Sequence, residues 1–175
     1  MEAMEQILLI TNAEIADAAA ITRMLNVAYR GREGEAGWTS EGEYLSGLRT
    51  TEEAMRELLT RSGIANFKYS MADKKIVGFV SLQPQADSIY LSMLTVLPLV
   101  QANGIGRQLL TFAEDYTRSV AKSAIIITVV NIRSELIAWY ERRGYHRTGG
   151  TEPFPEEAGQ PGVPVHLIEM RKEIV

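Results

Sequence analysis

A short run near the middle of the chain carries glycines in a setting suited to anion binding. Gln101-Ala102-Asn103-Gly104-Ile105-Gly106-Arg107 stands between a predicted strand and a predicted helix. The first turn of a helix leaves backbone N–H groups without partners and carries partial positive charge, so a phosphate there gains several hydrogen bonds. Gly104 and Gly106 lack a Cβ, which lets the chain approach an anion closely. The run predicts a phosphate cradle, and a plain strand-to-helix turn is the alternative.

A second group of chemistry-bearing residues follows the apolar run at 124–130. Tyr140 carries a phenol with an ordinary pKa of about 10, so it keeps its proton at neutral pH and can act as a general acid. Asn131 follows the end of a buried strand, where open α/β sheets bind ligands. The alternatives are a tyrosine packed in the core beside Trp139 and an asparagine that caps the next helix.

Both segments resemble motifs of the GNAT superfamily of acetyl-coenzyme A-dependent N-acyltransferases. Residues 101–106, with Val96 and Pro98 before them, resemble the signature Gln/Arg-x-x-Gly-x-Gly/Ala, which holds the pyrophosphate of coenzyme A (CoA). The second motif is Asn-x-x-Ala-x-x-x-Tyr-x-x-x-Gly-Phe/Tyr, and its counterparts here are Asn131, Ala138, Tyr140 and Gly144-Tyr145. The alanine stands four residues later, counted from Asn131, than in the common form. The part that bears these motifs covers roughly residues 76–148.

The resemblance implies a reaction and a set of site residues. Acetyl-CoA is the co-substrate, and a primary amine of a small molecule attacks its thioester directly within a ternary complex. Tyr140 protonates the departing thiolate, and Asn131 contacts the pantetheine arm or orients Tyr140. Residues 94–96 match the strand that pairs with pantetheine and shapes the oxyanion site. The CoA-binding residues that follow are Leu94, Thr95, Val96, Gln101, Ala102, Asn103, Gly104, Ile105, Gly106, Arg107 and Asn131.

Two other functions stay open at this point. A non-catalytic module that binds or senses acyl-CoA would keep the two glycines without needing Tyr140. A peptide or protein N-acetyltransferase would need an open groove for its acceptor. A dinucleotide-binding Rossmann fingerprint requires a third glycine, and position 109 is a leucine.

Residues 31–47 are predicted to form a loop on the acceptor side. The segment holds five glycines, Trp38 and Tyr44, and long loops in compact domains are often functional. We expect Tyr29 and Trp38 to line the acceptor pocket, although Trp38 is equally suited to anchoring the loop in the core. Many members of the superfamily carry a glutamate on the strand before the phosphate loop, and residues 88–96 contain no carboxylate. A dedicated base on that strand is therefore not expected.

The predicted elements give a mixed α/β (α+β) sheet of the GNAT type. Alternating or continuous apolar runs predict strands at 7–10, 67–71, 76–82, 89–96, 124–130, 145–148 and 165–174. Helical periodicity predicts helices over 15–28, 50–62, from 104 and over 134–143. Three antiparallel strands come first, and a β-α-β-α-β order follows, so the sheet should be mostly antiparallel with one parallel pair. Residues 149–164 are predicted to form a long loop.

Length and composition limit the remaining possibilities. The 175 residues suit a single domain over 1–175. The net charge of −4 gives no basic field for nucleic acid, and the apolar runs are too short to span a bilayer. There is no cysteine, which excludes an acyl-cysteine intermediate and thiolate metal sites. The two histidines are read as structural, and the run Glu141-Arg142-Arg143 as a solvated face. We expect a cytoplasmic monomer or homodimer that needs no metal.

Overall fold

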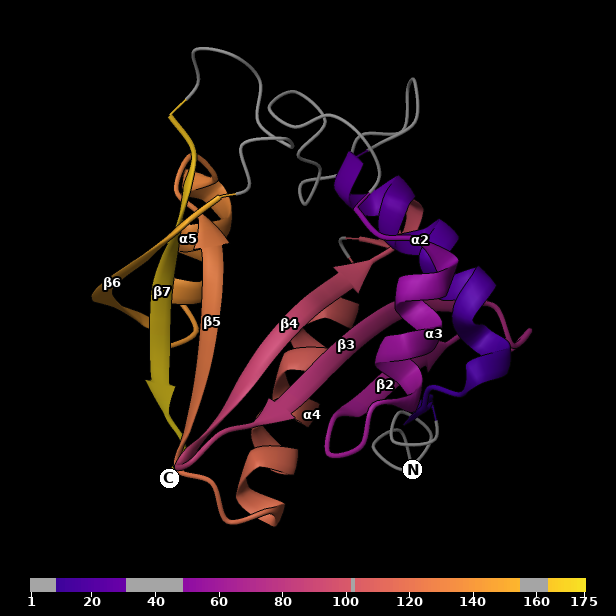
Figure 1. Ribbon diagram of the computed structural model, residues 1–175, viewed down its shortest axis with the longest axis horizontal. Coiled ribbons are helices and arrows are strands. Elements are labelled where there is room, and N and C mark those ends of the chain that lie inside the picture. The colour runs from indigo at the N-terminus through magenta and orange to yellow at the C-terminus, as the bar shows by residue number, and fades with distance from the viewer. Residues whose placement is uncertain (1–8, 31–48, 102, 155–163) are drawn as a thin grey trace.

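The computed structural model describes residues 9–30, 49–101, 103–154 and 164–175. One seven-stranded sheet has the order β1-β2-β3-β4-β5-β7-β6 (Figure 1). Its strands are β1 (Ile10–Asn12), β2 (Ala65–Ser70), β3 (Ile76–Pro84), β4 (Ser88–Val96), β5 (Ala124–Val130), β6 (His146–Pro153) and β7 (His166–Glu173). Only the β4–β5 pair is parallel, and the other five pairs are antiparallel. The prediction of a mixed, mostly antiparallel sheet with one parallel pair is confirmed.

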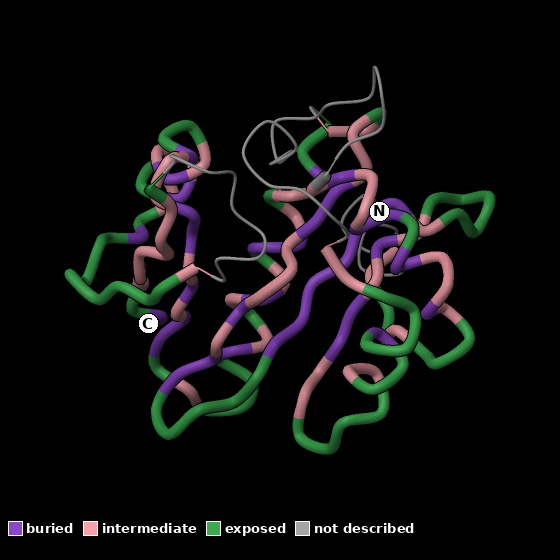
Figure 2. Tube along the Cα trace, turned by 45° about the horizontal axis from the view of Figure 1, so that its top comes forward, coloured by how far each residue is buried: buried purple, intermediate pink, exposed green. Residues whose placement is uncertain are grey.

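Helices lie on both faces of the sheet. The 3-10 turn η1 (Ile15–Asp17), α2 (Ala18–Arg30) and α3 (Glu52–Thr60) lie on one face over β2–β4. After the 3-10 turn η2 (Pro98–Val100), α4 (Ile105–Ser119) and α5 (Ser134–Glu141) lie on the other face (Figures 1 and 2). The strand–α4–strand unit joins β4 to β5 in parallel, because a parallel pair needs a crossover helix.

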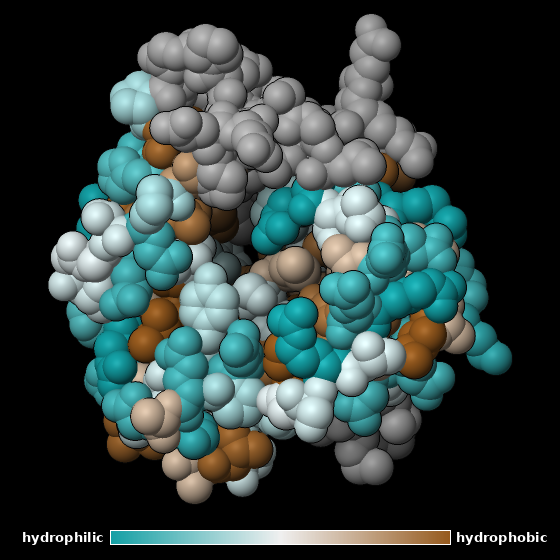
Figure 3. Space-filling model, viewed as in Figure 1, coloured by the Kyte–Doolittle hydropathy of each residue, from teal (hydrophilic) through white to brown (hydrophobic). Residues whose placement is uncertain are grey.

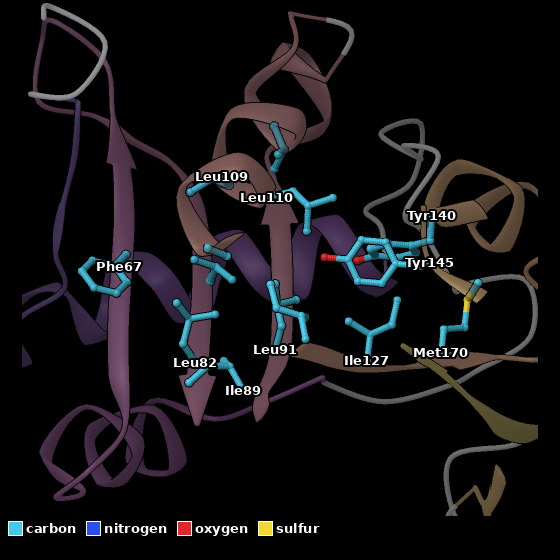
Figure 4. Close-up of a cluster of buried hydrophobic side chains, with 14 of the residues drawn as sticks. Phe67, Leu82, Ile89, Leu91, Leu109, Leu110, Ile127, Tyr140, Tyr145 and Met170 are labelled. Atoms are coloured by element: carbon cyan, nitrogen blue, oxygen red, sulfur yellow. The ribbon is translucent and has the colours of Figure 1, made fainter. Parts of the chain in front are cut away.

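The two helical layers enclose two hydrophobic cores. The larger core joins α4 and α5 to the strands, and Figure 4 shows Leu109, Leu110 and Tyr140 over Leu91 and Ile127. The smaller core packs α2 and α3 onto the opposite face at Phe79. Strands β3 and β5 are almost entirely buried because helices or neighbouring strands cover them, which is why their sequences read as continuous apolar runs.

Gly78 on β3 allows α4 to lie close to the sheet. A Cβ at this position would lie 2.9 Å from Leu109 Cδ1 and 3.1 Å from Tyr69 Cβ. These separations are too short for carbon atoms, so only glycine fits without a shift. The Tyr69 hydroxyl also donates to Gln108 Oε1 at 3.0 Å. These contacts fix the height of α4 above the sheet and therefore the position of its N-terminus.

Several predicted boundaries were wrong. The first strand spans 10–12 instead of 7–10, and Glu14 is the N-cap residue of the first turn, where Ile15 is exposed. The helix predicted over 50–62 is shorter, because Thr51 is the N-cap residue of α3 and its hydroxyl accepts from the Ala54 N–H at 3.2 Å. The final hairpin differs most, because β6 runs to Pro153 where a loop from residue 149 was predicted. Both faces of β6 are exposed, so no apolar alternation marks it in the sequence.

Candidate active site

The centre of the sheet opens where its two halves meet. Parallel pairing between β4 and β5 is limited to residues 88–90 opposite 124–126. Both strands continue for several residues beyond this point and diverge (Figure 1). Figure 3 shows this face of the molecule hollowed at the same place. An extended segment of a ligand can therefore lie against the exposed edge of β4 as an added strand would.

A β-bulge on β4 changes the strand beside the opening. The register shifts between Phe79 and Ser81, and two residues on β4, Met93 and Leu94, oppose the single residue Val80 on β3. Met93 takes a positive φ of 55°, which is uncommon for a non-glycine residue and is typical of bulges next to functional sites. The Thr95 hydroxyl donates to the Met93 carbonyl at 2.8 Å and fixes the bulge. The bulge therefore redirects the backbone at Leu94.

The N-terminus of α4 lies at the end of this strand. Gly104 is the N-cap residue with φ 75°, a left-handed conformation that strains residues with a Cβ. Gln108 N–H donates to Gly104 C=O at 3.0 Å in the first turn. Helix geometry then leaves the N–H groups of residues 105–107 pointing out of the helix, and no side chain caps them. The predicted cradle therefore presents three backbone N–H donors, from which an anion could accept hydrogen bonds.

A pocket of about 310 Å³ lies in front of these N–H groups. Its lining residues are Val96, Gln101, Gly104, Ile105, Gly106, Arg107, Trp139 and Arg143. A Cβ on Gly106 would lie 3.6 Å from Val96 Cγ2 and 3.9 Å from Trp139 Cζ2, which is ordinary van der Waals contact. A methyl group here would therefore take up space in the pocket without clashing with the protein. The Gln101 amide donates to the Val96 carbonyl at 2.8 Å, tying the loop to the end of β4.

Tyr140 lies on α5, across the opening from β4. Its ring is buried and packs edge-to-face against Trp139 and Tyr145, with centroids 4.9 and 5.4 Å away. Burial raises the pKa of Tyr140, the nearby Tyr29 phenol raises it further, and Arg143 opposes both. The phenol is therefore protonated at neutral pH. Within the described ranges no residue forms a hydrogen bond with its hydroxyl.

Tyr29 reaches the same region from the opposite face of the sheet. Its hydroxyl donates to the Leu94 carbonyl at 3.2 Å, which places the end of α2 against the bulge. Its influence on the pKa of Tyr140 places the two phenols near each other. The Arg49 guanidinium lies over the Tyr29 ring at 5.2 Å, and the Asn26 side chain accepts from the Arg49 N–H at 2.8 Å. Tyr29, Leu94 and Tyr140 therefore come together from three elements.

Asn131 is held by the strand next to it. Its amide oxygen accepts from the His166 N–H at 3.0 Å, and its amide nitrogen donates to the Pro164 carbonyl at 3.4 Å. The alternative that it caps the next helix is wrong, because Arg133 is the N-cap residue of α5 and makes no side-chain cap. Asn131 joins the end of β5 to the start of β7.

Three sequence predictions fall outside the described residues. Ala102 in the cradle and Trp38 on the predicted acceptor side both lie there, as do the glutamates of residues 31–47. Conversely, the cradle includes two residues that sequence reasoning assigned elsewhere. Trp139 and Arg143 line it from α5 and the turn that follows. Their spacing of four residues was the available signal, because it places both side chains on one side of the helix.

No group of three or more His, Cys, Asp or Glu side chains is arranged to hold a metal ion in residues 9–30, 49–101, 103–154 and 164–175. Within the same ranges, no helix combines the length and apolar character needed to cross a membrane.

Comparison with known proteins identifies the family. Residues 39–170 match the family model described as "Acetyltransferase (GNAT) domain". No curated protein sequence matches the chain. Among solved structures, the Escherichia coli ribosomal-protein-S18-alanine N-acetyltransferase is 18% identical with a TM-score of 0.71, covering 94% of this chain and 92% of that one. The Brucella melitensis ribosomal-protein-alanine N-acetyltransferase is 23% identical with a TM-score of 0.70, covering 94% and 99%.

A third structure carries a different acceptor in its name. A spermidine N-acetyltransferase chimera from Vibrio cholerae is 18% identical with a TM-score of 0.68, covering 94% of this chain and 93% of that one. At these identities the structures show a shared fold, and the family match covers most of the chain. Members of this family use acetyl-CoA as co-substrate. The chain therefore belongs to the GNAT acetyltransferase family and is an N-acetyltransferase.

Proposed function

We propose that this protein transfers the acetyl group of acetyl-CoA to a primary amine of a small molecule, by direct attack in a ternary complex. The observation that carries the proposal is the meeting of three features at one opening. They are the unpaired edge of β4, the uncapped N-terminus of α4 and the buried, protonated phenol of Tyr140. Each suits a different part of acetyl-CoA: the pantetheine arm, the diphosphate and the thioester sulfur.

The proposed path of acetyl-CoA follows from these positions. The diphosphate accepts hydrogen bonds from the N–H groups at 105–107, helped by the charge of Arg107. The pantetheine arm lies along residues 94–96, where β5 has diverged from β4. The thioester then lies near the bulge, between the phenols of Tyr29 and Tyr140.

The proposed chemistry needs two proton movements. The neutral amine attacks the thioester carbonyl carbon, and the tetrahedral intermediate collapses with cleavage of the C–S bond. Tyr140 donates its proton toward the departing sulfur. Burial weakens the phenol as an acid, but the same apolar surroundings raise the pKa of a thiol there, so transfer stays feasible. The proton lost by the amine passes to water, because β4 has no carboxylate.

Other residues have supporting roles in the proposal. Asn131 positions the end of β5 beside the opening through its bonds to His166 and Pro164, and its amide still offers an N–H toward the pantetheine arm. Tyr29 fixes the acceptor side of the site against Leu94, and Trp38 is proposed to line the same side. The proposal includes one domain over residues 1–175 and a cytoplasmic enzyme, monomeric or dimeric, that works without metal.

A panel of amines tests the proposal. Each is incubated with acetyl-CoA, and released CoA is detected with a thiol reagent, which has no protein background because the chain lacks cysteine. The panel includes polyamines, amino acids, aminoglycosides and peptides with free N-termini. Small amines should be acetylated with higher kcat/KM than any peptide. Turnover of peptides alone would assign a protein acceptor, and calorimetric binding of acetyl-CoA without turnover of any amine would support a binding module.

A further inference from the structure

A second pocket adjoins the cradle on the side away from β4. It has a volume of about 500 Å³ and is lined by Arg107, Leu110, Thr111, Glu114, Arg142, Arg143 and Lys172. Arg107 and Arg143 line both pockets, so the two are continuous. Below, we call this second space the arginine pocket. It has a larger volume than the cradle pocket and is built from α4, the turn after α5 and β7.

The arginine pocket keeps a surplus of positive charge after its internal ion pairs are counted. Lys172 Nζ lies 2.9 Å from Glu114 Oε1, and the Tyr145 hydroxyl donates to the same oxygen at 3.4 Å. Glu114 is therefore neutralised within the pocket. Glu141 on the neighbouring turn pairs with Arg147 at 3.3 Å, outside the lining. Among the described residues, no ion pair joins Glu114 or another carboxylate to Arg107, Arg142 or Arg143, so their positive charges remain in excess.

Arg143 is held in an orientation that leaves one of its donors unused. Its guanidinium stacks on the Trp139 ring at 3.8 Å, and Nη1 donates to the Trp139 carbonyl at 2.9 Å. Nε is buried and has no hydrogen-bond partner in the described part of the chain. A buried donor without a partner is costly, and such groups often mark sites that a ligand completes.

The surrounding charges add a second and independent sign of an anion site. Burial lowers the pKa of Arg143, and Arg107 and Arg142 lower it further by repulsion. Three like charges gathered at one pocket destabilise one another unless an anion compensates them. Because Arg143 is stacked and hydrogen-bonded, it cannot relieve the repulsion by turning into solvent without losing both contacts.

We propose that the arginine pocket binds the 3′-phosphate of CoA and makes the enzyme select CoA over dephospho-CoA. This inference rests on the proposed function, because the diphosphate must first lie on the N-terminus of α4. The ribose then carries a phosphate monoester close to the diphosphate, and at neutral pH this group has a charge of about −1.5 to −2. Of the three arginines, only Arg142 lines the arginine pocket without also lining the cradle pocket. We therefore assign Arg142 as the specificity residue for the 3′-phosphate.

Paired co-substrates test the assignment. We would measure kcat/KM for acetyl-CoA and for acetyl-dephospho-CoA, which lacks only the 3′-phosphate. The parent enzyme should prefer acetyl-CoA by roughly 10- to 100-fold, as expected for charge-assisted hydrogen bonds to a phosphate. Arg142→Ala should lower kcat/KM for acetyl-CoA about tenfold and change that for acetyl-dephospho-CoA by less than about twofold. Arg147→Ala removes a nearby exposed arginine outside the lining and should leave both values unchanged.

A binding measurement makes the inference independent of turnover. Calorimetry with CoA and with dephospho-CoA should show tighter binding of CoA to the parent and nearly equal binding to Arg142→Ala. The preference should also shrink as salt is raised. Equal affinity of the parent for both nucleotides would overturn this inference while leaving the proposed function intact. Failure of both nucleotides to bind the parent would overturn this inference and the proposed function. Circular dichroism confirms that each variant is folded.

Discussion

Replacing Tyr140 with phenylalanine is the sharpest test of the proposed chemistry. The change removes one hydroxyl and keeps the ring, so the edge-to-face contacts with Trp139 and Tyr145 persist. No described residue bonds to this hydroxyl, so its loss leaves no protein group without a partner. The melting temperature of Tyr140→Phe should therefore stay close to that of the parent, which separates a catalytic defect from an unfolding one.

The expected loss of activity follows from the leaving group. General acids contribute about 10²–10⁴-fold. A thiol has an ordinary pKa of about 8.5, so a thiolate departs more readily than an alkoxide and needs less help. We therefore expect kcat to fall by about 10²-fold, near the low end, which corresponds to about 2.7 kcal/mol of transition-state free energy. The calorimetric affinity for acetyl-CoA should change little.

The assay follows CoA release with a thiol reagent at saturating acetyl-CoA. Tyr145→Phe is a matched control, because Tyr145 is also a buried phenol with a raised pKa, but its hydroxyl donates to Glu114. This control should keep kcat within about twofold of the parent if only Tyr140 donates the proton. Equal kcat values for the parent and Tyr140→Phe would refute the role of Tyr140 and require another proton donor.

Three further predictions follow from the same geometry. Gly106→Ala should raise the Kd for acetyl-CoA at least about tenfold in calorimetry, because the added methyl group takes up space in the cradle. The melting temperature should not fall, because this methyl group lies at van der Waals distance from Val96 and Trp139. Unchanged affinity would place the diphosphate elsewhere. Burial raises the pKa of Tyr140 and Tyr145, so the stability that they contribute is complete below pH about 10 and is lost above it. Above pH about 10 the free energy of unfolding should fall by about 1.4 kcal/mol per pH unit for each of these tyrosines, because only the unfolded phenols ionise. Denaturant titrations should give a shallower fall for Tyr145→Phe than for the parent, and equal slopes would contradict this reasoning. Finally, kcat/KM should rise with pH along the ionisation of the amine. Single Glu→Gln changes at Glu33, Glu35, Glu41 or Glu43 should not abolish this rise. An acidic limb at pH about 6–7 that one of these changes removes would identify that glutamate as the base.

The sequence predicted the fold well where local patterns were strong. Continuous or alternating apolar runs located β3, β4 and β5, and the glycine run located the start of α4. Predictions failed at β6, where both faces are exposed and register depends on pairing with β7 across a bulge. No pattern within residues 146–153 carries that information, because the constraint is made by a strand some twenty residues later.

The candidate site was predictable in its residue types and less so in its arrangement. Gly104 and Gly106 predict an anion site because they follow a strand and stand at the start of a helix. Arg143 was interpreted as part of a solvated face, and the structure instead stacks it on Trp139 with a buried Nε. Charged residues at the end of a helix usually extend into solvent. Only the packing of α5 against α4 shows that this arginine turns toward the cradle.

The geometry also explains why an enzyme of this kind does not need a nucleophile or metal-ligating motif in its sequence. The opening arises because β4 and β5 pair for only three residues each and then diverge, with the bulge at Met93 turning the backbone at Leu94. Tyr29 arrives from one face of the sheet, and Tyr140 arrives from the other. Because a thioester is already activated, placing an amine beside it and a proton donor behind its sulfur supplies much of the required rate. In the proposed mechanism, function therefore depends chiefly on where β4 and β5 separate, which is a property of the sheet and not of any single motif.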